Sequence, residues 1–171
     1  MQSIVDCNYR ASEVFVGSFA LFHKCLRSLM SELPQRQAFR HLHPILSRWQ
    51  DSDLNGHIAG ATVYAYFDTA IQAYLLQQAG LDLQDGEVAG FVVSSAADFF
   101  ALPAFPDTLE VGLRVARLAG SSVEYQLALF RVEDGQPCAA GKLVQVFVER
   151  ESGRPAQLPA TLQAALERLQ G

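Results

Sequence analysis

Alternation of apolar and polar residues marks several segments of this chain as β-strands. The clearest runs cover residues 108–118, in which Leu109, Val111 and Leu113 alternate with other residues, and residues 122–132. Turn-forming residues separate the consecutive runs, which favours antiparallel hairpins. The whole pattern predicts five strands, over residues 39–49, 90–101, 108–118, 122–132 and 139–149.

A long apolar segment, residues 58–79, separates the first predicted strand from the other four. Asp68 is its only charged residue, and Gly80 follows it as a C-terminal cap. Apolar residues nearly all round this helix predict that it is buried at the centre of the domain. Its length would allow a membrane span, but Asp68 and three glutamines indicate protein surroundings. With an amphipathic helix at 158–169, the order of elements predicts an α+β fold in which an antiparallel sheet wraps around the long helix.

Residues 1–35 stand apart from this regular pattern. Phe15, Phe19, Phe22 and Leu26 have helical spacing, whereas the apolar stretch at 14–22 is too short to span a bilayer and shows no signal-peptide cleavage site. We interpret residues 1–35 as an extension of unknown role and residues 36–171 as a single domain.

The composition limits the classes of function. Half of the 171 residues are apolar and 18% are charged, so the chain as a whole is not intrinsically disordered. The formal net charge is −5 and no basic residues cluster, which argues against nucleic-acid binding. The three cysteines are widely separated and lack metal-site spacing, so we expect a reducing compartment and a cytoplasmic location. The low charge also favours a surface that another subunit covers.

Candidate chemistry concentrates in residues 48–57, which read Arg-Trp-Gln-Asp-Ser-Asp-Leu-Asn-Gly-His directly before the long helix. Three interpretations are open. The stretch from Asp51 to Gly56 matches half of a calcium loop, but Thr62 replaces the bidentate glutamate and Pro44 lies where an entering helix is needed. The same residues also suit a simple turn whose side chains satisfy backbone N–H groups. The third interpretation is catalytic, with a carboxylate beside the free N–H groups of a helix N-terminus.

This segment resembles the signature of a known enzyme family. Arg48-Trp49-x-Asp51-x-Asp53-x-Asn55-Gly56-His57-Ile58, followed by Tyr66-Phe67-Asp68, is similar to the pattern of hotdog-fold acyl-CoA thioesterases in the 4-hydroxybenzoyl-CoA thioesterase-like branch. The resemblance continues through Asp98-Phe99, Pro103-x-x-Pro106-Asp107, Ser121-Ser122-Val123, Phe147-Val-Glu149 and Gly153-Arg-Pro155, and it covers roughly residues 38–160. It implies the hotdog fold, a five-stranded antiparallel sheet wrapped around a long central helix.

The resemblance also implies roles for individual residues. Asp53 matches the carboxylate that acts as nucleophile or general base, and the backbone N–H of Gly60 matches the group that polarises the thioester carbonyl. Many relatives carry two asparagines where this chain has Ala59 and Gly60, a change that keeps the backbone donor. His57 follows Asp53 by four residues and is a candidate for orienting Asp53 or a water molecule. The candidate substrate contacts are Asn55, Ala59, Phe91, Ser121 and Ser122.

For partners, the family implies an acyl-CoA substrate and a homodimer or homotetramer with the active site between subunits. We expect no cofactor and no metal, since His41 and His43 would share one strand face without an evident third ligand. Two alternatives to a thioesterase stay open. One is a noncatalytic hotdog protein that binds acyl thioesters, and the other is a hotdog hydratase or dehydratase, which needs a paired histidine and acid.

Overall fold

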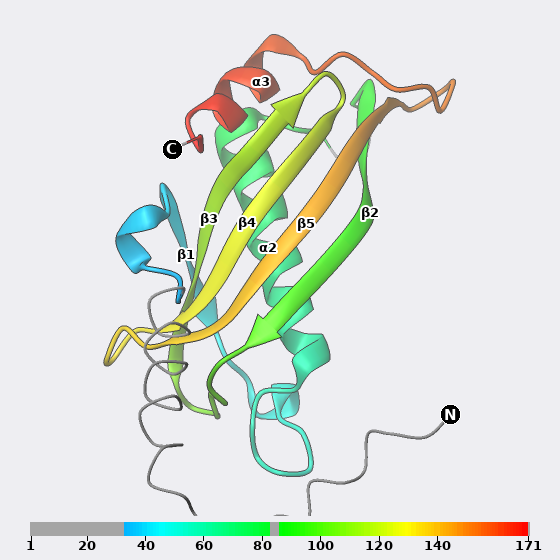
Figure 1. Ribbon diagram of the computed structural model, residues 1–171. Coiled ribbons are helices and arrows are strands. Elements are labelled where there is room, and N and C mark those ends of the chain that lie inside the picture. Colours follow the sequence, from blue (N-terminus) through cyan, green and yellow to red (C-terminus); the bar gives the residue numbers. More distant parts are fainter. Residues whose placement is uncertain (1–32, 83–85, 171) are drawn as a thin grey trace, which may run out of the picture. The chain divides into compact units, whose positions relative to one another are not determined.

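A five-stranded antiparallel sheet packed on a long helix forms the fold in the computed structural model, which describes residues 33–82 and 86–170 (Figure 1). The sheet order is β1-β3-β4-β5-β2, so β1 and β2 are the edge strands. This architecture confirms the predicted α+β hotdog fold. The strands are β1 (His41–Leu46), β2 (Val88–Phe99), β3 (Thr108–Ala119), β4 (Ser122–Arg131) and β5 (Pro137–Glu149). The amphipathic helix predicted within residues 1–35 lies outside the described residues.

The long helix α2 (Gly60–Ala79) lies along one face of the sheet, and α3 (Ala160–Glu167) lies across the end of α2 (Figure 1). Apolar residues of α2 three or four positions apart face the sheet. Phe67 lies so close to β5 that a Cβ atom at Gly141 would stand 2.5 Å from its ring, so glycine is required there. Gly80 caps α2 in the left-handed conformation, with φ of 62°, as predicted. Among the described residues, no helix is long and apolar enough to cross a membrane.

The helix α2 is not buried on every side, and the prediction of complete burial is wrong for a single chain. Ala61, Tyr64, Ala65 and Asp68 lie on a face that stays exposed, and Tyr64 is 37% accessible. The sequence records that the helix is apolar all round, but it does not record whether the same chain or another chain covers each side.

The first strand and the long helix also begin or end at different residues than predicted. Strand β1 ends at Leu46, and Trp49–Asp51 form a short 3-10 helix, η2. Helix α2 begins at Gly60 because the backbone N–H groups of Ile58 and Ala59 donate to Pro103 and Asp51. Those bonds hold Ala59 in an extended conformation, with ψ of 142°.

Candidate active site

The loop of residues 51–59, which joins η2 to α2, carries most of the candidate residues. Two main-chain bonds close the neck of this loop, where Asp51 and Asp53 face His57 and Ala59. The N–H of Asp53 donates to the carbonyl of His57 (2.7 Å), and the N–H of Ala59 donates to the carbonyl of Asp51 (3.0 Å). The N–H of Ile58 donates to Pro103 (2.8 Å), which fastens the loop to the segment before β3. The 51–59 loop is therefore shaped mainly by backbone contacts.

The Asp53 carboxylate is held by the loop that carries it. Its Oδ1 accepts hydrogen bonds from the backbone N–H groups of Asn55 (2.8 Å) and His57 (3.1 Å). The bond from His57 makes the largest contribution to lowering the pKa of the Asp53 carboxyl, and the bond from Asn55 the next largest. The group is therefore ionised at neutral pH. The Oδ2 atom has one long contact, 3.4 Å from Asn55 Nδ2. One oxygen is thus anchored, while the other has lone pairs available for a water molecule or a thioester.

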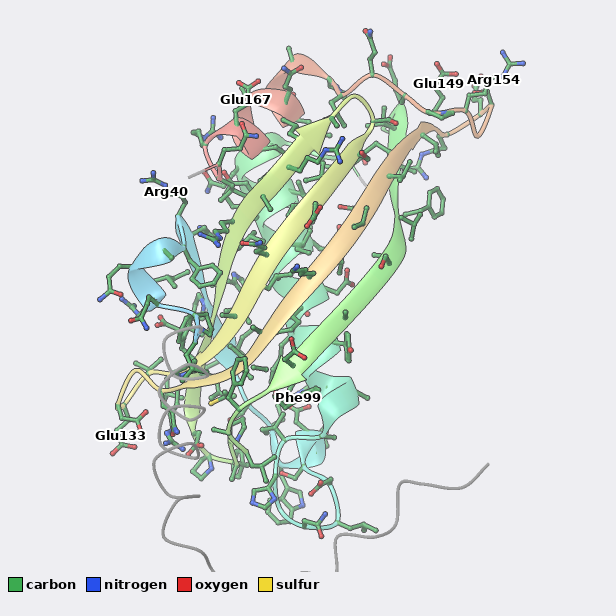
Figure 2. The ribbon with its side chains drawn as sticks, in the orientation of Figure 1. Arg40, Phe99, Glu133, Glu149, Arg154 and Glu167 are labelled. Atoms are coloured by element: carbon green, nitrogen blue, oxygen red, sulfur yellow. The ribbon has the colours of Figure 1, made fainter. Side chains whose placement is uncertain are left out.

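The first turn of α2 offers backbone donors close to this carboxylate in sequence. The N–H groups of Thr62 and Val63 donate to the carbonyl of Ala59, and Ala59 supplies no side-chain cap. Gly60, as the first helical residue, has no acceptor within the helix, and none is found among the described residues. The ring of Phe99 lies 3.6 Å from where a Cβ of Gly60 would stand. Phe99 is labelled at the end of β2 in Figure 2. A donor and an apolar side chain therefore meet at the start of α2.

Asp51, two residues before Asp53, has different surroundings. It is 4% exposed, and its carboxylate accepts hydrogen bonds from the Arg48 backbone N–H (2.8 Å), the Arg48 guanidinium (3.0 Å) and the Tyr66 hydroxyl (2.7 Å). Burial raises the pKa of the Asp51 carboxyl, but the hydrogen bonds from Arg48 and Tyr66 together outweigh burial and lower it. A calcium loop needs Asp51 and Asp53 to converge on one ion, and this arrangement does not fit that alternative.

His57 contributes to the loop through its backbone. Its N–H donates to the Asp53 carboxylate, and its carbonyl accepts the Asp53 N–H. Together with Asp53, Asn55, Ala59 and Gly60, it belongs to one continuous stretch of the chain, so five of the predicted site residues lie in or next to the 51–59 loop. Orientation of Asp53 by the His57 imidazole stays a prediction.

The remaining predicted contacts lie at the other end of the sheet within a single chain. Ser121 and Ser122 belong to the β3–β4 turn, which is remote from the 51–59 loop (Figure 1). The Ser122 hydroxyl donates to the carbonyl of Ala119 at 3.1 Å, a bond within the turn. Ser122 and Phe91 both pair with Val146 of β5, one from each side, so they share a row across the sheet. Their role as substrate contacts stays a prediction.

The structure brings two further residues to the site. Phe99 reaches Gly60 from β2, and Tyr66 reaches Asp51 from the second turn of α2. Both belong to motifs of the family resemblance, and those motifs are the sequence signal that points to them. Neither contact follows from sequence spacing, because each joins different elements.

The paired histidines of β1 show contacts of a packing kind. The His41 ring packs edge-on against Tyr74 at 4.9 Å between centroids, and burial, with a smaller contribution from His43, lowers the pKa of His41. Within residues 33–82 and 86–170, no three His, Cys, Asp or Glu side chains form a group that could hold a metal ion.

Comparison with known proteins connects this geometry to one family. Residues 47–166 match the family model described as the thioesterase-like superfamily. The crystal structure of the PA5185 protein from Pseudomonas aeruginosa strain PAO1 is 53% identical in sequence, with a TM-score of 0.78, and the match covers 81% of this chain and 97% of that protein.

Two more distant solved structures share the fold. A thioesterase from Thermus thermophilus, complexed with coenzyme A and Zn, is 26% identical with a TM-score of 0.63, over 77% of this chain and 95% of that protein. Slr0204 from Synechocystis, a 1,4-dihydroxy-2-naphthoyl-CoA thioesterase, is 22% identical with a TM-score of 0.67, over 73% of this chain and 93% of that protein.

Proposed function

Because the chain belongs to the thioesterase-like superfamily and is a thioester hydrolase, we propose that it hydrolyses acyl-CoA with Asp53 as nucleophile or general base. The observation that carries this proposal is the state of Asp53. Its carboxylate is ionised, is anchored through one oxygen, and lies in the loop that leads to the free N–H of Gly60 at the start of α2. The coenzyme A bound to the Thermus thermophilus thioesterase supports the choice of acyl-CoA as substrate.

The chemistry needs an oriented oxygen and a place for negative charge. As a general base, Asp53 accepts a proton from water while the water oxygen bonds to the carbonyl carbon. As a nucleophile, its Oδ2 bonds to that carbon and forms an anhydride, which water then hydrolyses. On either route the carbonyl oxygen gains charge that the Gly60 N–H stabilises, the C–S bond breaks, and CoA leaves as a thiolate that takes a proton from Asp53 on the general-base route or from water on the nucleophilic route.

Release of free thiol from a panel of acyl-CoAs tests the activity. Aliphatic and aromatic acyl groups of several lengths are compared, and we expect enzyme-dependent thiol release from at least one of them. Binding of acyl-CoA without thiol release would support a noncatalytic binding protein. Hydration or dehydration of the acyl chain without thiol release would support a hydratase or dehydratase.

We further propose that the site is completed by a second copy of the chain. The two sheet edges are unequally protected against pairing. Strand β1 has six residues and includes Pro44, which has no N–H to donate, whereas β2 has twelve residues and no proline. On β2, Phe91 is 58% exposed and Val93 is 62% exposed. Strand β2 is irregular only at a β-bulge around Val93, and a long apolar edge of this kind favours pairing with another chain.

Pairing of β2 with its copy about a two-fold axis is antiparallel. The residue-91 end of one strand would then lie beside the residue-99 end of the other. This arrangement would bring the end of one subunit that carries Phe91 and Ser122 toward the 51–59 loop of the other. It also agrees with the exposure of Asp53 and Gly60 in a single chain, since a reacting thioester is better served where bulk water is excluded.

A charge placed on the β2 edge tests this interface. We expect Val93→Lys to shift the protein toward monomers in sedimentation velocity and to lower activity at the same time, because the two-fold axis places two like charges near each other. Val132→Lys is the matched control, since Val132 is 46% exposed in the turn that follows β4. A parent protein that is monomeric and active at assay concentrations would contradict the proposed shared site.

A further inference from the structure

We propose that Asp51 and Tyr66 form a positioning pair that fixes the Asp53 carboxylate relative to the Gly60 N–H. This inference rests on the proposed function and concerns two residues that do not contact the reacting atoms. The Tyr66 hydroxyl donates to Asp51 Oδ2 at 2.7 Å, and both side chains are buried, with Tyr66 6% exposed.

Asp51 joins three parts of the site through different atoms. Its carboxylate binds Arg48 at the start of η2 and Tyr66 in the second turn of α2. Its carbonyl accepts the N–H of Ala59 at 3.0 Å and the Thr62 hydroxyl at 3.4 Å, both at the beginning of α2. Both the side chain and the main-chain carbonyl of Asp51 therefore tie the neck of the 51–59 loop to α2.

The consequence for chemistry is a fixed separation between two groups that act together. Asp53 follows Asp51 by two residues on one side of the neck, and Gly60 follows Ala59 on the other side. If the Tyr66 bond is removed, Asp51 stays bound to Arg48 but loses its side-chain link to the helix. The Asp53 carboxylate and the Gly60 N–H are then held in register mainly by the main-chain bonds of Asp51 and Asp53, and small displacements of catalytic groups reduce turnover strongly.

A second tyrosine of α2 provides a control for a purely structural role. Tyr74 is 5% exposed and donates to the carbonyl of Ala165 at 2.7 Å, so it matches Tyr66 in burial and in the length of its hydrogen bond. It lies eight residues further along α2, about 12 Å from Tyr66 at 1.5 Å per residue, and away from the 51–59 loop. Removing either hydroxyl costs one buried hydrogen bond, to a carboxylate oxygen for Tyr66 and to a main-chain carbonyl for Tyr74.

The experiment compares Tyr66→Phe with Tyr74→Phe by kcat, KM, melting temperature and amide hydrogen exchange at Ala59. We expect both variants to melt at lower temperature, Tyr66→Phe by the larger amount because its lost bond goes to a carboxylate. Only Tyr66→Phe should lower kcat, by roughly tenfold or more, with KM changed by less than about twofold. It alone should accelerate exchange of the Ala59 amide, whose acceptor is Asp51.

A double variant tests whether the two residues act as a unit. Asp51→Asn keeps an oxygen acceptor but removes the charge, and we expect Asp51→Asn with Tyr66→Phe to lower kcat no further than the more damaging single change. Multiplicative losses would contradict the pairing.

The parent protein and Asp53→Asn are measured in the same assay, so that two failures can be told apart. An inactive parent overturns the proposed function, and unchanged Ala59 exchange in Tyr66→Phe would then overturn the positioning pair separately. With an active parent, a Tyr66→Phe protein that retains the kcat of Tyr74→Phe overturns the positioning role alone.

Discussion

Replacement of Asp53 by asparagine is expected to lower kcat for acyl-CoA hydrolysis by about 100-fold or more, with little change in melting temperature. The amide oxygen of asparagine still accepts the backbone N–H groups of Asn55 and His57, so the 51–59 loop keeps its shape. The amide cannot act as a nucleophile or accept a proton as the ionised carboxylate does. Turnover and thermal unfolding of the purified variant measure the two effects.

Asp134→Asn is a matched control for that experiment. Asp134 is an exposed turn carboxylate whose Oδ1 accepts the Gln136 N–H at 3.1 Å. Hydrogen bonds, mainly from Arg131 and then from Gln136, lower the pKa of Asp134, just as hydrogen bonds within the 51–59 loop lower the pKa of Asp53. It lies in the β4–β5 turn and is expected to leave kcat unchanged. Near-parent turnover in folded Asp53→Asn would remove Asp53 from the mechanism.

Gly60→Pro is the second substitution with a large expected effect, a fall in kcat of about 100-fold, the scale of losing one oxyanion donor. Proline removes the N–H that we propose polarises the carbonyl. Its ring suits the first position of a helix, and Ala59, with φ of −62° and ψ of 142°, already has the conformation that precedes proline. Folding should therefore persist, which circular dichroism and thermal unfolding check.

Gly60→Ala separates loss of the donor from added bulk. Its methyl group would meet the Phe99 ring at 3.6 Å, an ordinary van der Waals distance, and the N–H is retained. We expect Gly60→Ala to change mainly the preference among acyl groups, since the methyl stands beside the proposed carbonyl site. If folded Gly60→Pro hydrolyses thioesters as fast as Gly60→Ala, the polarising donor lies elsewhere.

Much of the fold is predictable from the sequence because its rules are local. Alternating residues of β3 such as Leu109, Val111 and Leu113 are fully buried, and Gly80 ends α2 in the conformation that favours glycine. The start of α2 is not predictable in this way. Ile58 and Ala59 are apolar, but their N–H groups donate to Pro103 and Asp51 outside the helix, and helical periodicity does not report such competition.

In the candidate site, too, features set by neighbouring residues are predictable from the sequence, and features set by contacts between elements are not. Asp53, Asn55, His57 and Gly60 are neighbours in the chain, so the motif alone places them together. The different surroundings of Asp51 and Asp53 depend on Tyr66, fifteen residues after Asp51, which binds one carboxylate and not the other. The exposed side of α2 could not be predicted either, because an apolar residue looks the same in the sequence whether its own chain or another chain covers it.

Main-chain bonding within the 51–59 loop has a consequence for evolvability. Backbone groups close the neck and hold Asp53, so most side chains of the loop carry little of its architecture. Leu54 is fully exposed at the tip, and Leu102 is 63% exposed on the neighbouring segment. Substitutions at such positions would alter the surface beside the proposed site without breaking the bonds that hold Asp53. We therefore expect single substitutions there to change the substrate range at little cost to folding.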